Sequence, residues 1–410
     1  MPSLKSRRRF LLQAGVGLGA FDAIASAWSA APRASFDAIT PFAFGAKGDG
    51  RADDTAALNA AYEHARQRRA PAVSLCGATY RVTAGIYARG VSTQGEGATI
   101  VATVDAARGG AAFEWGGNGS FVRDLTFDLS NTSKADMQGV LNVVDNARNQ
   151  RFENNCIVAR TIGATPRQSN IFGAWFMGTG LTGLFVTNNQ FEACTYGVQI
   201  NNQAGMTGDV RRAPLGRASS HIHIAGNVCI DASIGVNTPH IGCSNVIVQG
   251  NTITAQRLVM DLPLNIAHVT DIAVVGNTVA SNASSANGTL HVEDATGAIT
   301  ISGNVVSVLA RNNGIQVGTR PSVSGDAREK RKVVISANHI EGSGAAADSA
   351  GILIPDAETI DTVIANNAID RFAEGITVVS RCLVQGNVIT ACRTPLRVTR
   401  DSVQAGNLIA

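Results

Sequence analysis

Short stretches of alternating apolar and polar residues recur along most of this chain. Each stretch has alternating apolar residues, a glycine or other small residue, an asparagine and a further apolar pair, as in VQGNTI ending at Ile253 and ISGNVV ending at Val306. Such strict alternation is typical of β-strands with one buried face, and helical spacing is absent from this region. The pattern therefore predicts many short strands.

The asparagine of this stretch recurs with variable spacing toward the C-terminus. Successive spacings run from 20 to 38 residues, and the positions are Asn155, Asn189, Asn227, Asn251, Asn277, Asn304, Asn338, Asn367, Asn387 and Asn407. A period in the twenties with insertions is the signature of a solenoid, in which each repeat stacks on its neighbours. We expect the equivalent asparagines to lie at a turn and to hydrogen-bond one another up the stack.

A third alternating stretch, often introduced by glycine, follows the asparagine in most repeats. Examples are YGVQIN at Gly197, GIQVG at Gly314 and GILIP at Gly351. Three short strands and three turns in each repeat predict an all-β chain that winds into a parallel β-helix. A β-propeller needs longer repeats with four strands, and a leucine-rich array needs regular leucine spacing, so both fit this sequence less well.

The segment before the repeats has a distinctive sequence. FGAKGDGRADDTAALNAAYEHARQRR runs from Phe44 to Arg69, and VSLCGATYRVTAGIYARGVSTQGEGATI follows and ends at Ile100. This segment resembles the entry segment of the pectate-lyase-like superfamily, which includes polysaccharide lyases, polygalacturonase-like hydrolases and phage tailspikes. The resemblance implies a right-handed, single-stranded parallel β-helix of the pectin-lyase-like type and a role in carbohydrate processing. Ala43 departs from the pattern, because such segments often carry Asp at that place.

A short amphipathic helix is expected within this entry segment. It runs from Thr55 to Arg68, and we expect it to cap the open N-terminal end of the solenoid core. Asp53 and Asp54 precede it and can cap its first turn. We therefore interpret these two acids as structural residues and not as catalytic ones.

The N-terminus resembles a targeting signal. Residues 6–12 read SRRRFLL, as in a twin-arginine signal, and a Gly- and Ala-rich apolar stretch follows to Ala20, with candidate cleavage sites around Ala27 to Ala31. We expect a signal peptide over residues 1–31 and a periplasmic or secreted protein. This layout also resembles that of a group of twin-arginine-exported bacterial repeat proteins.

The remaining residues are expected to form one β-helix domain over 36–410. Its entry and cap segment covers 36–100, and its stacked coils cover 101–410. No other stretch reaches the roughly 18 apolar residues that a membrane helix requires. We therefore expect no membrane span in the mature chain, and the oligomeric state is left open.

Composition and charge agree with a narrow solenoid core. The chain of 410 residues has 43 glycines, 45% apolar residues and only 5% aromatic residues. Its net charge of +3 equals the charge of residues 1–31, in which four basic residues outnumber the single Asp22, so the rest is close to neutral. Nothing in that balance favours a nucleic-acid partner. The seven cysteines include no C-x-x-C pair. Four of them, Cys156, Cys194, Cys229 and Cys392, fall just after a repeat asparagine and fit buried core positions or a thiol stack better than a disulfide framework or a metal site.

Long polar segments lie on either side of the glycine-led strands. Two follow such strands, at Gln203–Ser220 and Thr319–Lys332, and two precede them, at Ser281–Gly288 and Ser343–Ala350. Insertions concentrated around one face of a solenoid usually mark its binding face. We therefore expect a polysaccharide groove on the outward face of the sheet that these strands form.

Alternation predicts which side chains point outward into that groove. They are Gln199, Asn201, Asn237, Asp261, His291, Glu293, Gln316, Thr377 and Arg397, with Asp294 at the end of its strand and Arg320 just beyond the next one. We assign substrate binding to Gln199, Asn201, Asn237, Gln316, Arg320 and Arg397.

Candidate catalytic chemistry is densest in RLVMD at Arg257–Asp261 and LHVED at Leu290–Asp294. As neighbouring strands, these stretches would hold Asp261 and Glu293 roughly 5 Å apart, with His291 about 7 Å away on the same face. Two carboxylates that close together take different pKa values, as glycoside hydrolysis requires. The candidate catalytic residues are Asp261, His291, Glu293 and Asp294.

Several alternatives stay open at this point. The carboxylates could instead bind Ca²⁺ while His291 or an arginine removes a proton beside a uronate, which gives β-elimination. No cofactor is otherwise implied. The acids also fit a solvated outer face, because outward charged residues are ordinary. The Asn-Thr-Asp, Gly-His-Gly and Arg-Ile-Lys blocks of polygalacturonase-like enzymes and the Asp-Pro-His-Glu block of mannuronan epimerases are absent. A non-catalytic solenoid that binds a glycan or a partner is therefore the second hypothesis.

Overall fold

The structure is a computed structural model of the full chain. It describes residues 38–103, 111–131, 136–159, 170–201, 217–237, 242–255, 262–282, 287–310, 312–318, 330–344, 348–357, 359 and 361–410. The predicted signal peptide over 1–31 lies outside these residues. The chain from Ile39 to Ala410 forms one compact unit. None of its described helices is both long and apolar enough to cross a membrane.

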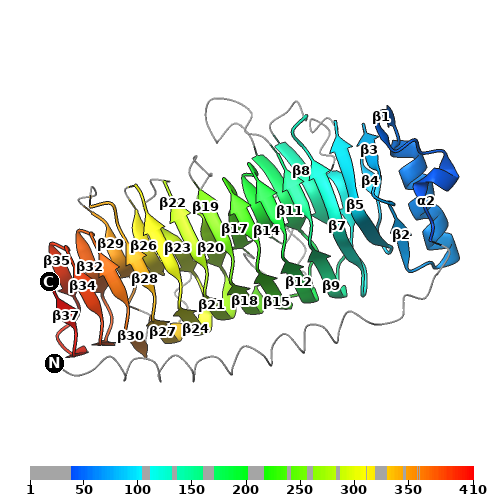
Figure 1. The fold of residues 1–410 in the computed structure, drawn as a ribbon. Helices are drawn as coiled ribbons and strands as arrows, with labels where there is room; N and C mark the ends of the chain where they lie inside the picture. Colours follow the sequence, from blue (N-terminus) through cyan, green and yellow to red (C-terminus); the bar gives the residue numbers. More distant parts are fainter. Residues whose placement is uncertain are drawn as a thin grey trace, which may run out of the picture. The chain divides into compact units, whose positions relative to one another are not determined.

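Each repeat contributes three strands, and equivalent strands of successive repeats pair in parallel (Figure 1). The result is the right-handed parallel β-helix that the repeat pattern and the entry segment predict. The glycine-led stretches form a 12-stranded sheet, called sheet B here. Its strands are β4 (Ile86–Tyr87), β6 (Ala111–Trp115), β8 (Asp136–Asn142), β11 (Asn170–Phe176), β14 (Tyr196–Ile200), β17 (Ser233–Asn237), β20 (Leu264–Ala267), β23 (Gly288–Glu293), β26 (Asn313–Val317), β29 (Ala350–Ile354), β32 (Glu374–Val378) and β35 (Thr394–Arg397).

The other strands form a 25-stranded sheet in which two ladders run side by side. The ladder before the repeat asparagines contains β7 (Phe121–Asp128), β9 (Arg148–Glu153), β12 (Thr182–Thr187), β15 (Ser219–Ala225), β18 (Cys243–Gln249), β21 (Val269–Val275), β24 (Thr296–Ser302), β27 (Lys330–Ser336), β30 (Thr362–Ala365), β33 (Cys382–Gln385) and β36 (Val403–Ala405). The ladder after them contains β10 (Cys156–Val158), β13 (Gln190–Glu192), β16 (Val228–Ile230), β19 (Thr252–Ala255), β22 (Thr278–Ser281), β25 (Val305–Val308), β28 (His339–Glu341), β31 (Ala368–Asp370), β34 (Val388–Thr390) and β37 (Leu408–Ile409).

The entry segment closes one end of this stack (Figure 1). It contains η1 (Pro41–Phe44), β1 (Asp49–Asp53), α2 (Thr55–Arg68), β2 (Ala72–Ser74), β3 (Thr79–Val82) and β5 (Ser92–Ala102). The helix α2 has the predicted bounds and buries Leu58 and Tyr62 against the first coils. The tyrosine hydroxyl lies 2.9 Å from Oγ1 of Thr93 on β5.

The two acids before α2 are structural, but one of them does not cap the helix as predicted. Asp54 occupies the N-cap position without a capping hydrogen bond, and its carboxylate instead accepts the backbone N–H groups of Lys47 and Gly48. Asp53 accepts hydrogen bonds from the backbone N–H and the hydroxyl of Thr55. The preceding loop competes for Asp54 because two of its own backbone N–H groups use this carboxylate as their acceptor.

The repeat asparagines form the predicted ladder from Asn155 to Asn407. In each step, the backbone N–H and the side-chain Nδ2 of one asparagine donate to Oδ1 of the next, and both distances are 2.9 Å between Asn251 and Asn277. The residue before each asparagine adopts the left-handed conformation, and it is always Gly, Asn or Ala. The small residue of the repeat pattern is thus required by the turn and not by the core.

The glycines that begin the sheet B strands are required by close packing. A Cβ atom on Gly314 would lie 2.4 Å from Cγ2 of Ile340, and one on Gly351 would lie 2.4 Å from Cγ2 of Ile369. Those isoleucines follow the asparagine ladder and fill the core, so only glycine lets the chain turn from one ladder into sheet B beside them.

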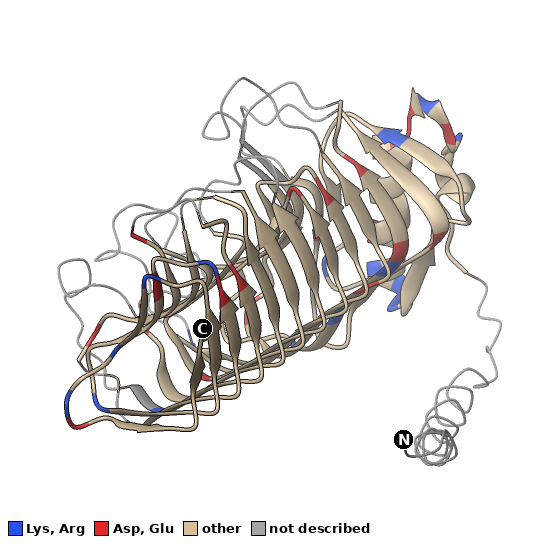
Figure 2. Ribbon diagram, turned by 60° about the vertical axis from the view of Figure 1, so that its left-hand side comes forward, with Lys and Arg blue, Asp and Glu red and all other residues tan. Residues whose placement is uncertain are grey.

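The core is a continuous column of aliphatic side chains inside the coils. In sheet B the inward positions align Ile200, Val236, Ile266, Val292 and Val317 on successive strands. Among the described residues, charged side chains gather at the two ends of the stack, around α2 and in the last coils, and are fewer on the strands between them (Figure 2). The middle of the outward face of sheet B is therefore formed mainly by uncharged side chains.

The seven cysteines are free thiols, and four of them are buried in the core, namely Cys194, Cys229, Cys243 and Cys382. Of the four predicted core cysteines, Cys156 and Cys392 are only partly buried. Cys194 and Cys229 are fully buried. Burial raises the pKa of the Cys194 thiol to about 12, so this thiol is protonated and unreactive at neutral pH.

Candidate functional site

One column of outward side chains runs across sheet B. Strand register aligns the residues of this first column in the order Trp175, Gln199, Gly235, Asn265, His291, Gln316, Leu353, Thr377 and Arg397. Each column member alternates with inward aliphatic residues, as the sequence pattern requires. The structure thus brings four of the predicted site residues, Gln199, His291, Gln316 and Arg397, into one line.

A second outward column lies two residues further along the same strands. Asn237 on β17 pairs with Ala267 on β20, and Ala267 pairs with Glu293 on β23. Asn201 directly follows Ile200, whose partner Val236 precedes Asn237. Two residues along a strand span about 7 Å, so the second column runs beside the first.

The predicted pairing of Arg257–Asp261 with Leu290–Asp294 is wrong. The strand beside β23 is β20, and its register places Asn265 opposite His291 and Ala267 opposite Glu293. The expected carboxylate pair is therefore not formed by facing strand positions. Asp261 lies outside the described residues, as does Arg320. The spacing to the next repeat asparagine could have located β20 in the sequence. Ala267 precedes Asn277 by 10 residues, and its strand partner Glu293 precedes Asn304 by a similar 11 residues.

Asp294 does not lie on the outward face with His291. The strand ends at Glu293, and Asp294 has a φ of 45° at the corner that follows. Its Oδ2 is 3.9 Å from Nδ1 of His268, which occupies the corresponding corner of the preceding coil. This geometry separates Asp294 from the predicted catalytic set.

Arg397 lies in the first column, but its guanidinium is used within the protein. Its Nη2 is 2.9 Å from Oε1 of Glu374, and the arginine side chain is 66% exposed. The same carboxylate accepts a hydrogen bond of 2.5 Å from Oγ1 of Thr377. This end of the column is thus an exposed charged network that is already satisfied.

Gln316 also has internal partners. Its Nε2 donates to the carbonyl of Gly318 at 3.0 Å, and its Oε1 accepts from Nδ2 of Asn313 at 3.1 Å. The side chain is almost fully buried. We therefore regard Gln316 as a residue that holds the β26 turn in place beside His291, in contrast to its predicted role in substrate binding.

His291 is fully buried, although its position on the strand is outward. Its Nε2 is 3.4 Å from the carbonyl oxygen of Gly318, and since a carbonyl can only accept, Nε2 carries the proton. Nδ1 is then an acceptor, and it has no hydrogen-bond partner among the described residues. Burial lowers the pKa of His291 from 6.5 to about 4, so the ring is neutral at neutral pH.

Buried polar atoms without partners gather on this face. In the described part of the chain they are Nε1 of Trp175, Oε1 of Gln199, Oδ1 of Asn201, Oδ1 of Asn237, Oδ1 of Asn265 and Nδ1 of His291. They come from the consecutive strands β11, β14, β17, β20 and β23 or their ends, which span roughly 19 Å at the usual strand spacing. Native proteins pair nearly all such atoms, so this polar row marks a surface that a ligand or water completes.

Comparisons with protein-family models and with curated proteins found no match for the sequence. Solved structures do match it at low sequence identity. The surface adhesin PfbA of Streptococcus pneumoniae is 14% identical, with a TM-score of 0.54 over 91% of this chain and 97% of that one. The A-module of the Azotobacter vinelandii mannuronan C-5 epimerase AlgE6 is 17% identical, with a TM-score of 0.55 over 90% and 99%.

A third match is the catalytic unit of an α-1,3-glucanase from Streptomyces thermodiastaticus. It is 14% identical, with a TM-score of 0.58 over 93% of this chain and 69% of that chain. The chain is a parallel β-helix protein. At these identities, the likeness extends to the fold alone.

Two residues of the site of this β-helix protein were not predicted from the sequence. Trp175 and Asn265 contribute to the polar row, but neither stretch was recognised as a strand facing the groove. Phe172 stacks on Trp175 with ring centroids 4.1 Å apart and on Tyr196 at 5.1 Å. Trp175 packs with Ala111 and Leu141 in an apolar cluster separate from the main core. The row thus begins at an aromatic stack and ends at a neutral imidazole.

The described residues include no group of three or more His, Cys, Asp or Glu side chains that could hold a metal ion. The predicted Ca²⁺ site was built on Asp261, which lies outside the described residues. It stays a prediction.

Proposed function

We propose that this β-helix protein binds a polysaccharide along the outward face of sheet B, outside the cytoplasm. The observation that carries the proposal is the row of buried polar atoms without partners from Trp175 to His291. A sugar hydroxyl can donate to the amide oxygens and to Nδ1 of His291, and it can accept from Nε1 of Trp175. A glycan chain supplies such hydroxyls at regular intervals, which suits a row built from repeated strands.

The charges of the row indicate which glycan fits. From Trp175 to Gln316, the first column contains no charged side chain at neutral pH, because His291 is neutral. Arg397, at the far end, is paired with Glu374. Binding a polyuronate would leave its carboxylates without a described cation beside them. The row therefore favours a neutral, hydroxyl-rich stretch of polysaccharide. The twin-arginine-like N-terminus supports export to the periplasm or the exterior.

Replacing Gln199 with Met and Asn265 with Leu tests binding. These changes keep the side-chain volume but remove two polar atoms that have no described partner. We expect affinity for the best ligand of a polysaccharide panel to fall about tenfold or more, because each lost hydrogen bond contributes roughly 1 kcal/mol. The melting temperature should stay level or rise, since a buried unpaired polar atom is itself destabilising.

The matched control is Gln385→Met on the exposed edge of β33, which should change neither property. Unchanged affinity in the double variant, measured by calorimetry on the mature protein, would remove the basis of the proposal.

Cleavage of the bound chain is the second step of the proposal. His291 presents a neutral ring with an unpartnered Nδ1, and Glu293 lies two residues along the same face. In hydrolysis of a neutral chain, a carboxyl group at Glu293 can donate a proton to the leaving oxygen while the neutral imidazole takes one from the attacking water. β-Elimination would instead require a uronate unit beside His291. Residues i and i+2 of one strand lie about 7 Å apart on the same face, so His291 and Glu293 can reach the same stretch of a bound chain.

A Glu293→Gln variant separates an enzyme from a binding module. If Glu293 is the acid or base, turnover should fall by about 100-fold or more while affinity is kept. Unsaturated chain ends, detected by ultraviolet absorbance, indicate elimination, and reducing ends alone indicate hydrolysis. The exposed Glu96→Gln change serves as the control. Wild-type protein that binds a glycan but releases no new ends would identify a non-catalytic solenoid.

A further inference from the structure

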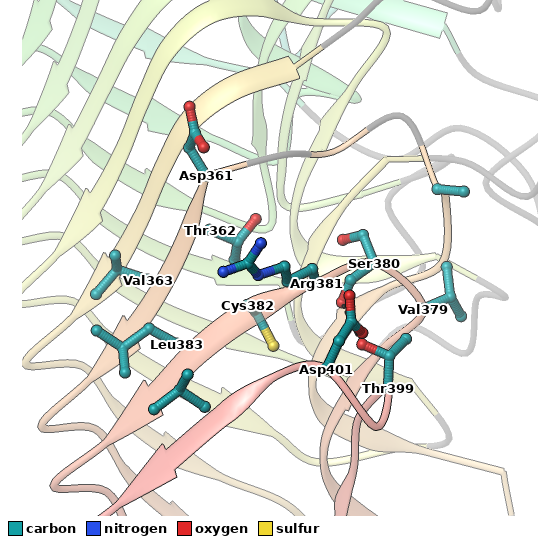
Figure 3. Close-up of a pocket in the computed structure, with 12 residues that line it drawn as sticks. Asp361, Thr362, Val363, Val379, Ser380, Arg381, Cys382, Leu383, Thr399 and Asp401 are labelled. Carbon is teal, nitrogen blue, oxygen red and sulfur yellow. Dashed lines mark hydrogen bonds between the residues drawn. The ribbon is translucent and has the colours of Figure 1, made fainter.

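A second pocket lies away from the polar row, at the C-terminal coils. Its volume is about 780 Å³, and it is lined by three consecutive coils where the chain passes from β29, β32 and β35 to β30, β33 and β36 (Figure 3). We propose that this pocket is a separate binding site for an uncharged sugar unit. The ligand class rests on the proposed function, but the residues of the pocket are independent of the polar row.

Three charged residues stand at equivalent positions in the pocket. Thr362 pairs with Cys382, and Leu383 pairs with Val403, so Asp361, Arg381 and Asp401 follow one another on adjacent coils. Adjacent coils are about 4.8 Å apart, which places Arg381 between the two aspartates along the stack. The hydroxyl of Thr399 donates to Asp401 and, with nearby Arg381, holds the pKa of that carboxyl below 3.8.

This arrangement selects against strongly charged ligands. At neutral pH the two carboxylates and the one guanidinium sum to −1, so an anion meets a negative field. A metal ion has no described group of three or more suitable ligands here. Sugar hydroxyls, by contrast, can accept from Arg381 and donate to either carboxylate.

Two buried hydroxyls strengthen the assignment. Thr362 is 2% exposed and Ser380 is 7% exposed, and the oxygen of each side chain has no hydrogen-bond partner among the described residues. Both line the pocket, and Figure 3 shows them on either side of Arg381. Hydroxyls held in this way are costly unless something pairs with them, and a ligand in the pocket would do so.

The remaining wall is apolar. Val379 is 46% exposed and Val403 is 54% exposed, so both present apolar surface to the pocket. They lie beside the charged ladder and offer contact to the C–H face of a sugar ring. A mostly apolar pocket with a few converging polar groups is the common form of a small-ligand site.

Cys382 is the one thiol in the described lining, and its surroundings argue for binding and not covalent chemistry. Its Sγ is 3.4 Å from Oγ of Ser402, whose oxygen also accepts the Cys382 backbone N–H at 3.1 Å. Burial raises the pKa of the thiol, so it is protonated at neutral pH. The pocket is therefore expected to hold a sugar without reacting with it.

Calorimetry with neutral tetrasaccharides of glucose, mannose and galactose tests the pocket on the full mature chain. The pocket variant is Thr362→Val with Ser380→Ala, which removes two hydroxyls with little change of shape, and Arg381→Met is a second, exposed change. We expect wild-type protein to bind two equivalents. Each pocket change should lower the affinity for one of the two equivalents about tenfold or more and leave the affinity for the other unchanged.

The row variant Gln199→Met with Asn265→Leu separates the two proposals. Loss of one equivalent in the pocket variants and of the other in the row variant supports both sites. A single wild-type equivalent that only the row variant removes overturns the pocket and keeps the proposed function. A single wild-type equivalent that only the pocket variants remove overturns the proposed function and keeps the pocket. If the folded wild-type protein binds none of the tetrasaccharides, both proposals are overturned.

Discussion

Replacing Asn277 with alanine is expected to lower the free energy of unfolding by roughly 3–5 kcal/mol. Oδ1 of Asn277 accepts the backbone N–H and Nδ2 of Asn251, and its own Nδ2 donates to Oδ1 of Asn304 and to the carbonyl of Val248. All of these atoms are buried in the middle of the stack. The substitution leaves several donors and acceptors without partners, and no water can reach them to compensate.

Asn407→Ala is the matched control for this prediction. Asn407 has the same role at the last rung, where it is only half-buried and has no further asparagine to donate to among the described residues. We expect a loss of roughly 1–2 kcal/mol there, because water can replace part of the network. Urea denaturation followed by circular dichroism measures both losses. Equal losses at the two positions would mean that burial of the ladder is not what makes it stabilising.

The stability of the protein is expected to fall as the pH drops from about 6.5 to 4 because of His291. The folded-state pKa is lowered to about 4 by burial, and the ordinary value is 6.5. Between these values the unfolded chain binds a proton that the folded chain does not, so acidification favours unfolding. The full shift corresponds to a change on the order of 3 kcal/mol, present above pH 6.5 and lost by pH 4.

His291→Gln should remove this part of the pH dependence. The difference in unfolding free energy between wild type and variant is the quantity to measure, because acidic side chains titrate equally in both. His339→Gln, on the exposed face of β28, is the control and should leave the wild-type slope intact. A wild-type slope that survives in His291→Gln would show that the ring is protonated at the same pH in the folded and unfolded chains.

Most of the architecture follows from short-range rules that are legible in the sequence. Alternation identified the strands, the asparagine spacing identified the repeat, and Thr55 to Arg68 was recognised as the cap helix with its observed bounds. The ladder contacts followed too, because equivalent residues of stacked coils must lie one above another. The strand β20 was misplaced because an insertion precedes it, and RLVMD has an equally good alternating pattern.

The site was predicted less well than the fold. Alternation correctly assigned Gln199 and His291 to one outward column, since side chains of a strand must point to opposite faces. It could not indicate that Gln316 and Arg397 have partners inside the protein, because those partners, Gly318 and Glu374, become neighbours only through the turn geometry. It also gave no reason to select Asn265, which becomes relevant only as the strand neighbour of His291.

The solenoid, its repeat and the sheet whose outward face carries the polar side chains all follow from the order of residues along the chain. These features depend on periods of two residues and of one coil, which are local properties of the chain. The packing of the coils against one another sets which polar atoms have no described partner, buries His291 as a neutral ring, and brings Asp361, Arg381 and Asp401 into one pocket. Those properties depend on how coils of unequal length align, and insertions between repeats hide that alignment from the sequence.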